Sequence, residues 1–128
     1  MVIEDMDGSL AVATEGELLD RLRSVRRGVY GAFILSHDEE EASLFLHMNG
    51  EKAYLHFFPD RSGDHPGFQS RSSSHTDAVC HFVQTDGGEA DSFDVSGDTV
   101  VSLDLAYAAA VEFLRAGSMP ASINWREV

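Results

Sequence analysis

Cysteine is nearly absent from this chain of 128 residues, and Cys80 has no second cysteine with which to form an internal disulfide. Long apolar runs are also missing, because no stretch approaches the roughly 18 residues that a membrane-spanning helix needs. The first residues, Met-Val-Ile-Glu-Asp, lack the basic start and apolar centre of a signal peptide. From these absences we expect a soluble, cytoplasmic protein with no membrane partner.

Basic residues are scarce as well. The chain has 9 lysines and arginines against 22 aspartates and glutamates, a formal net charge of −13 at pH 7. This charge argues against a nucleic-acid partner, because phosphates would repel the protein. It favours either a basic protein partner or simple solubility. The acids gather in turns at residues 38–41 and 86–98, while residues 72–114 contain no lysine or arginine.

Motifs for catalysis or metal binding are not found. His56, Asp60, Asp64 and His65 lie around a polar loop, but their spacing matches no zinc signature. The acidic run at 38–41 lacks the alternating ligands and glycine of a calcium loop, and no Gly-x-Ser-x-Gly elbow occurs. We therefore expect no metal, no cofactor and no catalysis. The alternative is a small-ligand or metal-binding module that uses the loop 56–68.

Helix signals stand at both ends of a run of strand signals. Thr14 and Glu17 form a capping box that predicts a helix reaching about Arg27. Ser102 is a candidate N-cap, and Gly117 is placed to end a helix over 103–116. Strands are expected in between and after, at 29–36, 43–48, 52–58, 68–74 (an edge strand), 78–85, 90–95 and 123–125. Consecutive strands favour one α+β domain over 1–128: an antiparallel twisted sheet of about six to seven strands, with two helices packed on one face.

The dipeptide Asn49-Gly50 predicts a hairpin, since a type I′ turn needs positive φ at both positions. A two-residue loop there pairs Leu46 with Ala53 and Phe45 with Tyr54. Side-chain alternation then assigns one set to the core: Leu44, Leu46, Met48, Ala53, Leu55 and Phe57. The other face carries Phe45, His47, Lys52, Tyr54, His56 and Phe58. That face is either covered by another strand, a loop or a terminus, or it is a partner-binding patch.

A second hairpin is expected around Gly87-Gly88. Two-residue closure predicts three cross-strand pairs: Phe82 with Phe93 and Cys80 with Val95 in the core, and His81 with Asp94 outside it. We interpret the last pair as an ionic or hydrogen-bonded contact. Cys80 and His81 are adjacent on a strand and point to opposite faces, so they cannot form a catalytic dyad with each other.

Residues 102–125 also carry a resemblance. Their pattern, Ala-Ala-x-Glu-Phe-Leu-x-x-Gly-x-x-Pro-x-x-Ile-x-Trp, resembles the C-terminal signature of small immunity proteins that are encoded beside deaminase-type toxins in bacterial polymorphic toxin systems. The resemblance implies an α+β protein that binds and neutralises a cognate toxin. The matching residues look structural: Phe113, Gly117, Pro120, Ile123 and Trp125. We expect Trp125 to be largely buried and to anchor the last strand beside the preceding helix.

The sequence therefore predicts a non-enzymatic immunity protein, a monomer or weak dimer, that blocks the active site or substrate channel of a toxin with a basic surface. The candidate contact residues are aromatic, imidazole and acidic: Phe45, Tyr54, His56, Asp38, Glu39, Glu40, Asp86, Glu89, Asp91 and Asp94. Acids would steer a basic partner, and aromatic groups would supply short-range affinity. A scaffold domain that dimerises through the face of Phe45 and Tyr54 is a further alternative.

Overall fold

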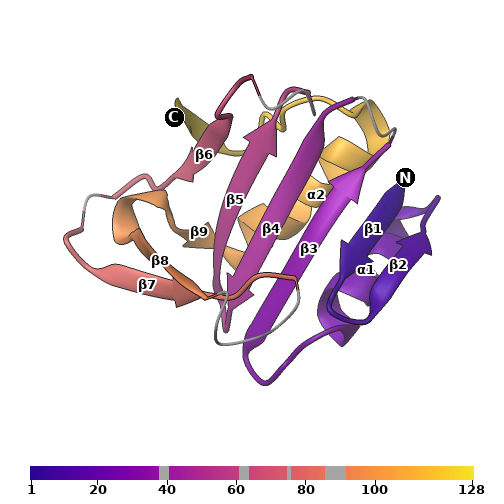
Figure 1. Cartoon of the computed structure of the whole chain (residues 1–128), viewed down its shortest axis with the longest axis horizontal. Coiled ribbons are helices and arrows are strands. Elements are labelled where there is room, and N and C mark those ends of the chain that lie inside the picture. Colours follow the sequence, from indigo (N-terminus) through magenta and orange to yellow (C-terminus); the bar gives the residue numbers. More distant parts are fainter. Residues whose placement is uncertain (38–40, 61–63, 75, 86–91) are drawn as a thin grey trace.

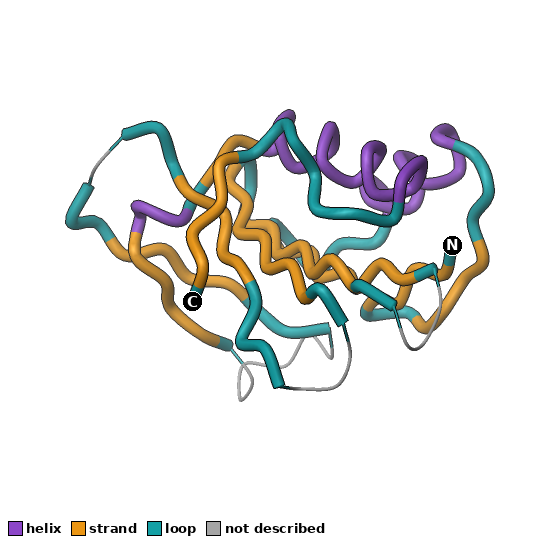
Figure 2. The backbone as a smooth tube through the Cα atoms, turned by 90° about the horizontal axis from the view of Figure 1, so that it is seen from above, coloured by secondary structure: helices purple, strands orange, loops and turns teal. Residues whose placement is uncertain are grey.

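The structure is a computed structural model that describes residues 1–37, 41–60, 64–74, 76–85 and 92–128. A large antiparallel sheet lies in the middle, with both helices on one face and a small hairpin on the other (Figures 1 and 2). The helices are α1 (Glu15–Ser24) and α2 (Leu103–Ala116), with a 3-10 turn η2 (Gly97–Thr99). The strands are β1 (Val2–Asp5), β2 (Gly8–Ala11), β3 (Tyr30–Ser36), β4 (Ser43–Asn49), β5 (Lys52–Phe58), β6 (Phe68–Arg71), β7 (Val79–Phe82), β8 (Phe93–Ser96), β9 (Val101–Ser102) and β10 (Asn124–Glu127). The predicted α+β class, with both helices on one side, is confirmed.

Both helices begin with the predicted caps. The Thr14 hydroxyl accepts a hydrogen bond from the Glu17 backbone N–H (3.2 Å), and the Glu17 carboxylate accepts one from the Thr14 N–H (3.1 Å). Ser102 likewise accepts from the Leu105 N–H (3.2 Å), and Gly117 closes α2 in the left-handed conformation at φ 67°. Helix α1 stops at Ser24, earlier than predicted, because Val25 turns to an extended backbone.

Within the described residues, eight strands form the large sheet in the order β10-β6-β5-β4-β3-β1-β2, with β9 paired to β5. The predicted edge strand β6 is therefore interior, since β10 covers its outer side. The hairpin β7–β8 forms a separate two-stranded sheet whose register matches the prediction: Cys80 pairs with Val95, His81 with Asp94, and Phe82 with Phe93. The one-sheet expectation is thus corrected to a sheet plus a covering hairpin.

The β4–β5 register differs from the prediction by two residues. Asn49 pairs with Lys52, so the loop is Gly50-Glu51, and Phe45 lies opposite His56 instead of Tyr54. Gly50 has a φ of 62°, and no described non-glycine residue has positive φ. This loop needs positive φ only at its first position, as in a type II′ turn, whereas the predicted turn required it of Asn49 too. A shift of two residues preserves the face of every side chain, so the predicted core and far faces stand.

The core lies between the sheet and the helices. It contains the predicted sheet residues Leu44, Leu46, Met48, Ala53, Leu55 and Phe57, with Phe33 and Leu35 from β3. Helix α2 contributes Phe113 and a row of fully buried alanines, Ala106, Ala109 and Ala110. These short side chains let the helix lie close to the sheet. No helix of the described residues is long and apolar enough to cross a membrane.

Trp125 is largely but not fully buried and packs against the core, in line with the expectation. Its strand β10 pairs with β6, and its ring lies 6.2 Å from the ring of Phe57. The indole N–H donates to the Pro120 carbonyl (2.7 Å), so the turn after α2 is tied to the last strand. Trp125 therefore anchors the tail at one end of the sheet, with part of its ring in solvent.

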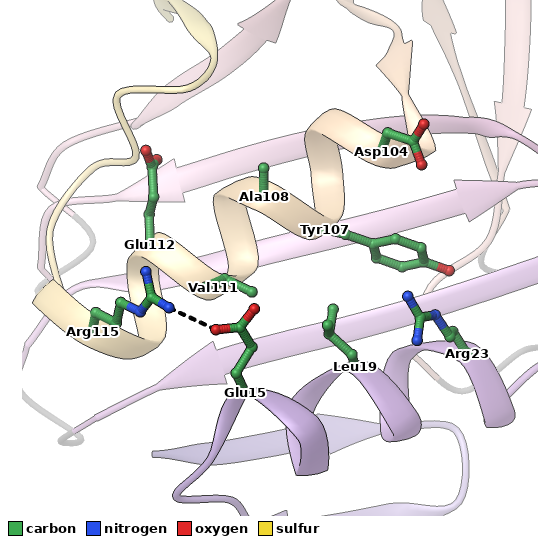
Figure 3. A pocket seen from close by; sticks show the side chains of 9 residues that line it. All are labelled: Glu15, Leu19, Arg23, Asp104, Tyr107, Ala108, Val111, Glu112 and Arg115. Carbon is green, nitrogen blue, oxygen red and sulfur yellow. Dashed lines mark hydrogen bonds and ion pairs between the residues drawn. The ribbon is translucent and has the colours of Figure 1, made fainter.

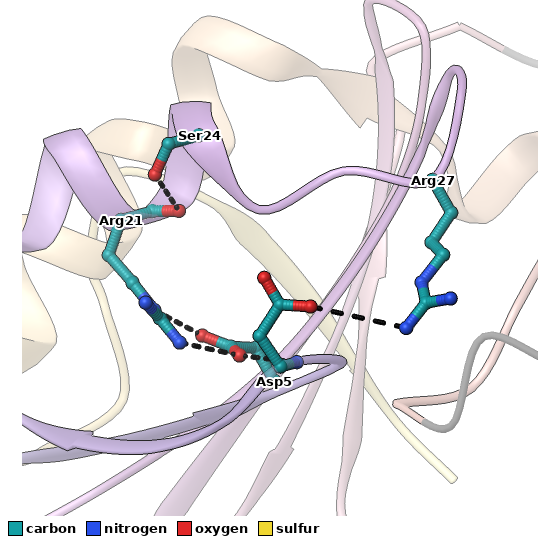
Figure 4. A network of polar contacts seen from close by, with 5 residues as sticks. Asp5, Arg21, Ser24 and Arg27 are labelled. Carbon is teal, nitrogen blue, oxygen red and sulfur yellow. Dashed lines mark hydrogen bonds and ion pairs between the residues drawn. The ribbon is translucent and has the colours of Figure 1, made fainter.

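A buried ion pair links β1 to helix α1 at the opposite side of the sheet from β10. Arg21 of α1 donates from Nε to Asp5 Oδ2 (2.6 Å) and from Nη2 to Asp5 Oδ1 (3.0 Å), and the Asp5 side chain has no exposed surface (Figure 4). These hydrogen bonds raise the pKa of Arg21. The contact between Asp7 and Arg27 is different in kind, because the atoms are 4.0 Å apart and both side chains are mostly exposed. Of these two ion pairs, Asp5–Arg21 is the one that joins β1 to α1.

Candidate functional site

The sheet face opposite the helices has one part buried under the β7–β8 hairpin and another part whose side chains are partly exposed. The β7–β8 hairpin covers His47 and Tyr54, which are only 4% and 5% exposed to solvent. The Phe93 ring lies 4.9 Å from His47 and 5.9 Å from Tyr54, and the fully buried Phe82 also packs on Tyr54 (6.2 Å). Tyr54 therefore supports the hairpin and offers almost no surface to a partner, which corrects its predicted place in the exposed patch.

His47 holds the hairpin on the sheet with a hydrogen bond. Its Nδ1–H donates to the carbonyl of Val83 (2.9 Å), the residue after β7. Burial lowers the pKa of His47 to about 4, against the opposing effect of this hydrogen bond. The imidazole is thus neutral at pH 7, in the state in which its Nδ1–H can be fixed as the donor.

The part of the face outside the hairpin is a small, partly exposed aromatic surface. Phe45, His56 and Phe58 are half-buried, the His56 ring stacks on Phe58 at 4.3 Å, and the Phe45 and Phe58 rings lie 5.1 Å apart. We define these three residues as the aromatic patch. Two of them, Phe45 and His56, were predicted contact residues, and they are direct cross-strand partners.

A chain of hydrogen bonds fixes the orientation of His56 in the aromatic patch. Gln69 donates to the Tyr54 hydroxyl (2.9 Å), that hydroxyl lies 3.3 Å from His56 Nδ1, and His56 Nε2–H donates to the Pro66 carbonyl (2.8 Å). Burial raises the pKa of Tyr54 and lowers that of His56. Both side chains are therefore neutral at pH 7, and the patch has a set geometry before any partner arrives.

Exposed polar groups flank this face on the hairpin. His81 Nδ1 lies 2.7 Å from Asp94 Oδ1, and both side chains are largely exposed. The His81 carbonyl accepts from the Asn49 side chain (2.9 Å), which fastens β7 to the end of β4. The predicted histidine–aspartate pair thus forms. Of the other predicted acids, these lie outside the described residues: Asp38, Glu39, Glu40, Asp86, Glu89 and Asp91.

The polar loop uses its histidine nitrogens within the fold. His65 Nδ1 accepts from the Gly67 N–H (2.8 Å), and its Nε2 lies 3.2 Å from a Glu127 carboxylate oxygen. His56 Nε2 is taken by Pro66, as described above. In the parts of the chain that the structure describes, no group of three or more His, Cys, Asp or Glu residues could hold a metal ion.

A groove of about 470 Å³, which no sequence pattern predicted, lies between α1 and α2 on their outer side (Figure 3). Its two ends are bridged by contacts between α1 and α2: Glu15 to Arg115 (2.6 Å) at one, and the Arg23 guanidinium 5.4 Å from the Tyr107 ring centre at the other. Helical periodicity could have shown that Leu19 and Val111 lie beside the core faces. It could not have shown that the two helices would be neighbours.

A model of a known protein family matches nearly the whole chain. A protein-family model described as Immunity protein Imm1 matches residues 7–127, which span both helices, the aromatic patch and the helix groove. No curated protein matches the chain.

Proposed function

Because the chain belongs to the Imm1 family of immunity proteins, we propose that it neutralises its cognate bacterial toxin by direct binding and without catalysis. The family match over residues 7–127 carries the proposal. The net charge of −13 supports a toxin with a basic surface as the partner, since an acidic protein attracts a basic surface and repels nucleic acid.

The proposed toxin is a deaminase that acts on nucleic acid, met in the cytoplasm. This step rests on the resemblance of residues 102–125 to immunity proteins of deaminase toxins and on charge. An enzyme that holds a nucleic-acid strand needs a basic substrate channel. An acidic protein of 128 residues is complementary to such a channel and would exclude the substrate from it.

The proposed contact face is the aromatic patch with the exposed side of β7–β8. Phe45 and His56 are held by packing and hydrogen bonds, so binding costs little side-chain entropy. Asp94 adds an exposed carboxylate on the β7–β8 hairpin. The acidic residues at 38–40 and 86–91 are proposed to steer the basic partner during association. Tyr54 is kept as the support of His56.

Co-expression with the toxin encoded beside this chain tests the function, with survival expected only when the chain is present. Binding kinetics on purified proteins test the face. Phe45→Ala should raise the dissociation rate at least tenfold, equivalent to about 1.4 kcal/mol, while Val2→Ala, a truncation at the exposed Val2 on β1, should not. Asp94→Asn should slow association at low salt, and Asp20→Asn on α1 is its control.

Loss of protection by the wild-type chain would refute the function itself. Protection together with wild-type kinetics in Phe45→Ala and Asp94→Asn would leave the function standing and exclude this face. Circular dichroism of each variant separates loss of contact from loss of fold.

A further inference from the structure

The helix groove is hollow at its centre because the side chains there are short. Helices α1 and α2 run antiparallel across it, with Glu15 and Arg115 meeting at one end and Arg23 and Tyr107 at the other (Figure 3). Between these bridges lie half-buried Leu19 and Val111 and the exposed methyl of Ala108. No bridge forms in this middle section among the nine lining residues, so the apolar floor stays open to solvent.

The ends of the groove are already fixed. The Tyr107 ring has Arg23 on its face, and its hydroxyl accepts from Arg26 Nη2 (3.3 Å). A partner that enters the groove therefore meets a preformed surface, which lowers the entropic cost of binding. A valley between two packed helices is also the geometry into which the ridge of a third helix fits.

Charge defines what fits there. Asp104 and Glu112 lie on α2 on the same side as Ala108 (Figure 3). They are eight residues apart, so about 12 Å separates their positions along the helix. The Glu112 carboxylate accepts from the Ser122 N–H (3.1 Å) and hydroxyl (3.0 Å), which fixes its direction. The apolar centre thus lies between two carboxylates at a spacing of about two helical turns.

We propose that this groove binds an amphipathic helix of the toxin, with small apolar side chains facing Leu19 and Val111 and lysine or arginine residues two turns apart facing Asp104 and Glu112. A second copy of this chain is a poor occupant, because each copy carries a charge of −13 and would place acids against acids. A nucleic acid is repelled by the same charge.

The inference rests on the proposed function and extends it, because α1 and α2 line the groove on one side of the sheet, while Phe45 and His56 lie on the strand face that points away from the helices. The toxin would therefore hold the immunity protein at two separated surfaces. Two linked contacts lower the dissociation rate beyond what either achieves alone. Loss of the groove contact should weaken the complex without abolishing it.

The test is Ala108→Trp, which places an indole over the groove, with Ala116→Trp as its control. Ala116 is exposed on the same helix and does not line the groove. The control therefore makes the same alanine-to-tryptophan change on α2 outside the groove. Against the cognate toxin, Ala108→Trp should raise Kd about tenfold or more, and Ala116→Trp less than about twofold. If Ala108→Trp fails to fold, Asp104→Lys with the control Asp20→Lys decides the question by the same comparison.

The outcomes separate the two proposals. Wild-type binding with equal Kd for Ala108→Trp and Ala116→Trp overturns the groove and leaves toxin neutralisation intact. A wild-type chain that does not bind the toxin overturns both. Additive losses in Phe45→Ala combined with Ala108→Trp support two separate contacts, since distant, independent sites add.

Discussion

As the pH falls below about 6.5, protonation linked to His47 should lower the free energy of unfolding before the carboxylates begin to titrate. The imidazole is 4% exposed and donates to the Val83 carbonyl, and burial lowers its pKa to about 4 from 6.5. Between pH 6.5 and about pH 4, His47 is protonated in the unfolded chain but stays neutral in the folded chain. Stability is therefore complete above about pH 6.5 and falls as the pH drops towards 4.

The size of the effect follows from the two pKa values. A pKa difference of about 2.5 corresponds to a loss of about 3 kcal/mol in the free energy of unfolding once the pH lies well below both pKa values, since each pKa unit is worth about 1.4 kcal/mol. At about pH 4.5 most of this, about 2–3 kcal/mol, is already lost. The carboxylates of the chain also begin to titrate there, so the measurement has to isolate the histidine.

Urea denaturation of the wild type and His47→Gln at about pH 7.5 and pH 4.5 isolates it. The wild type should lose about 2–3 kcal/mol more than His47→Gln over this range, because the amide keeps a donor but binds no proton. His81→Gln, at an exposed histidine, is the control and should lose as much as the wild type. Equal losses in the wild type and His47→Gln would refute the reasoning.

Two further predictions concern the ends of the sheet. Trp125→Ala should lower the free energy of unfolding by about 2 kcal/mol, less than for a fully buried tryptophan because the side chain keeps some exposure. A change below about 0.5 kcal/mol in urea denaturation would show that its hydrogen bond to Pro120 does not hold the tail. Asp5→Asn should cost about 2–3 kcal/mol by the same measurement, because it leaves the buried end of Arg21 without its counter-charge, whereas exposed Asp7→Asn should cost less than about 0.5. Equal costs at the two aspartates would contradict this account.

Local signals in the sequence were sufficient for the helices and for the faces of the strands. The caps at Thr14, Ser102 and Gly117 act within one turn of the chain, so their residue types identify them. Side-chain alternation identified the core face of β4 and β5 even though the register was wrong by two residues. Both successes have the same cause: the interaction that decides the structure lies within a few residues in the sequence.

Features that depend on distant segments were not predictable in the same way. The pairing of β10 with β6 joins residues more than 50 positions apart, and no local pattern distinguishes it from a free tail beside α2. The groove depends on Glu15 and Arg115 meeting across 100 residues of chain. Of the two outcomes that the sequence left open for the far face, the first occurs where the hairpin covers His47 and Tyr54, and a partner-binding role for the aromatic patch stays a prediction.

That division explains how a stable fold and the proposed contact surface can share one sheet face. The covered residues His47 and Tyr54 supply the packing that a hydrophobic hairpin needs, and Tyr54 then orients His56 at the edge of the cover. Hydrogen bonds limit the motion of His56, so a partner meets a ring with less rotamer entropy to lose. Because His47 packs against Tyr54, we expect protonation of His47 to loosen the hairpin and, through Tyr54, the direction of His56. The stability of the fold and the geometry of the proposed toxin-binding face are then expected to change together as His47 gains a proton.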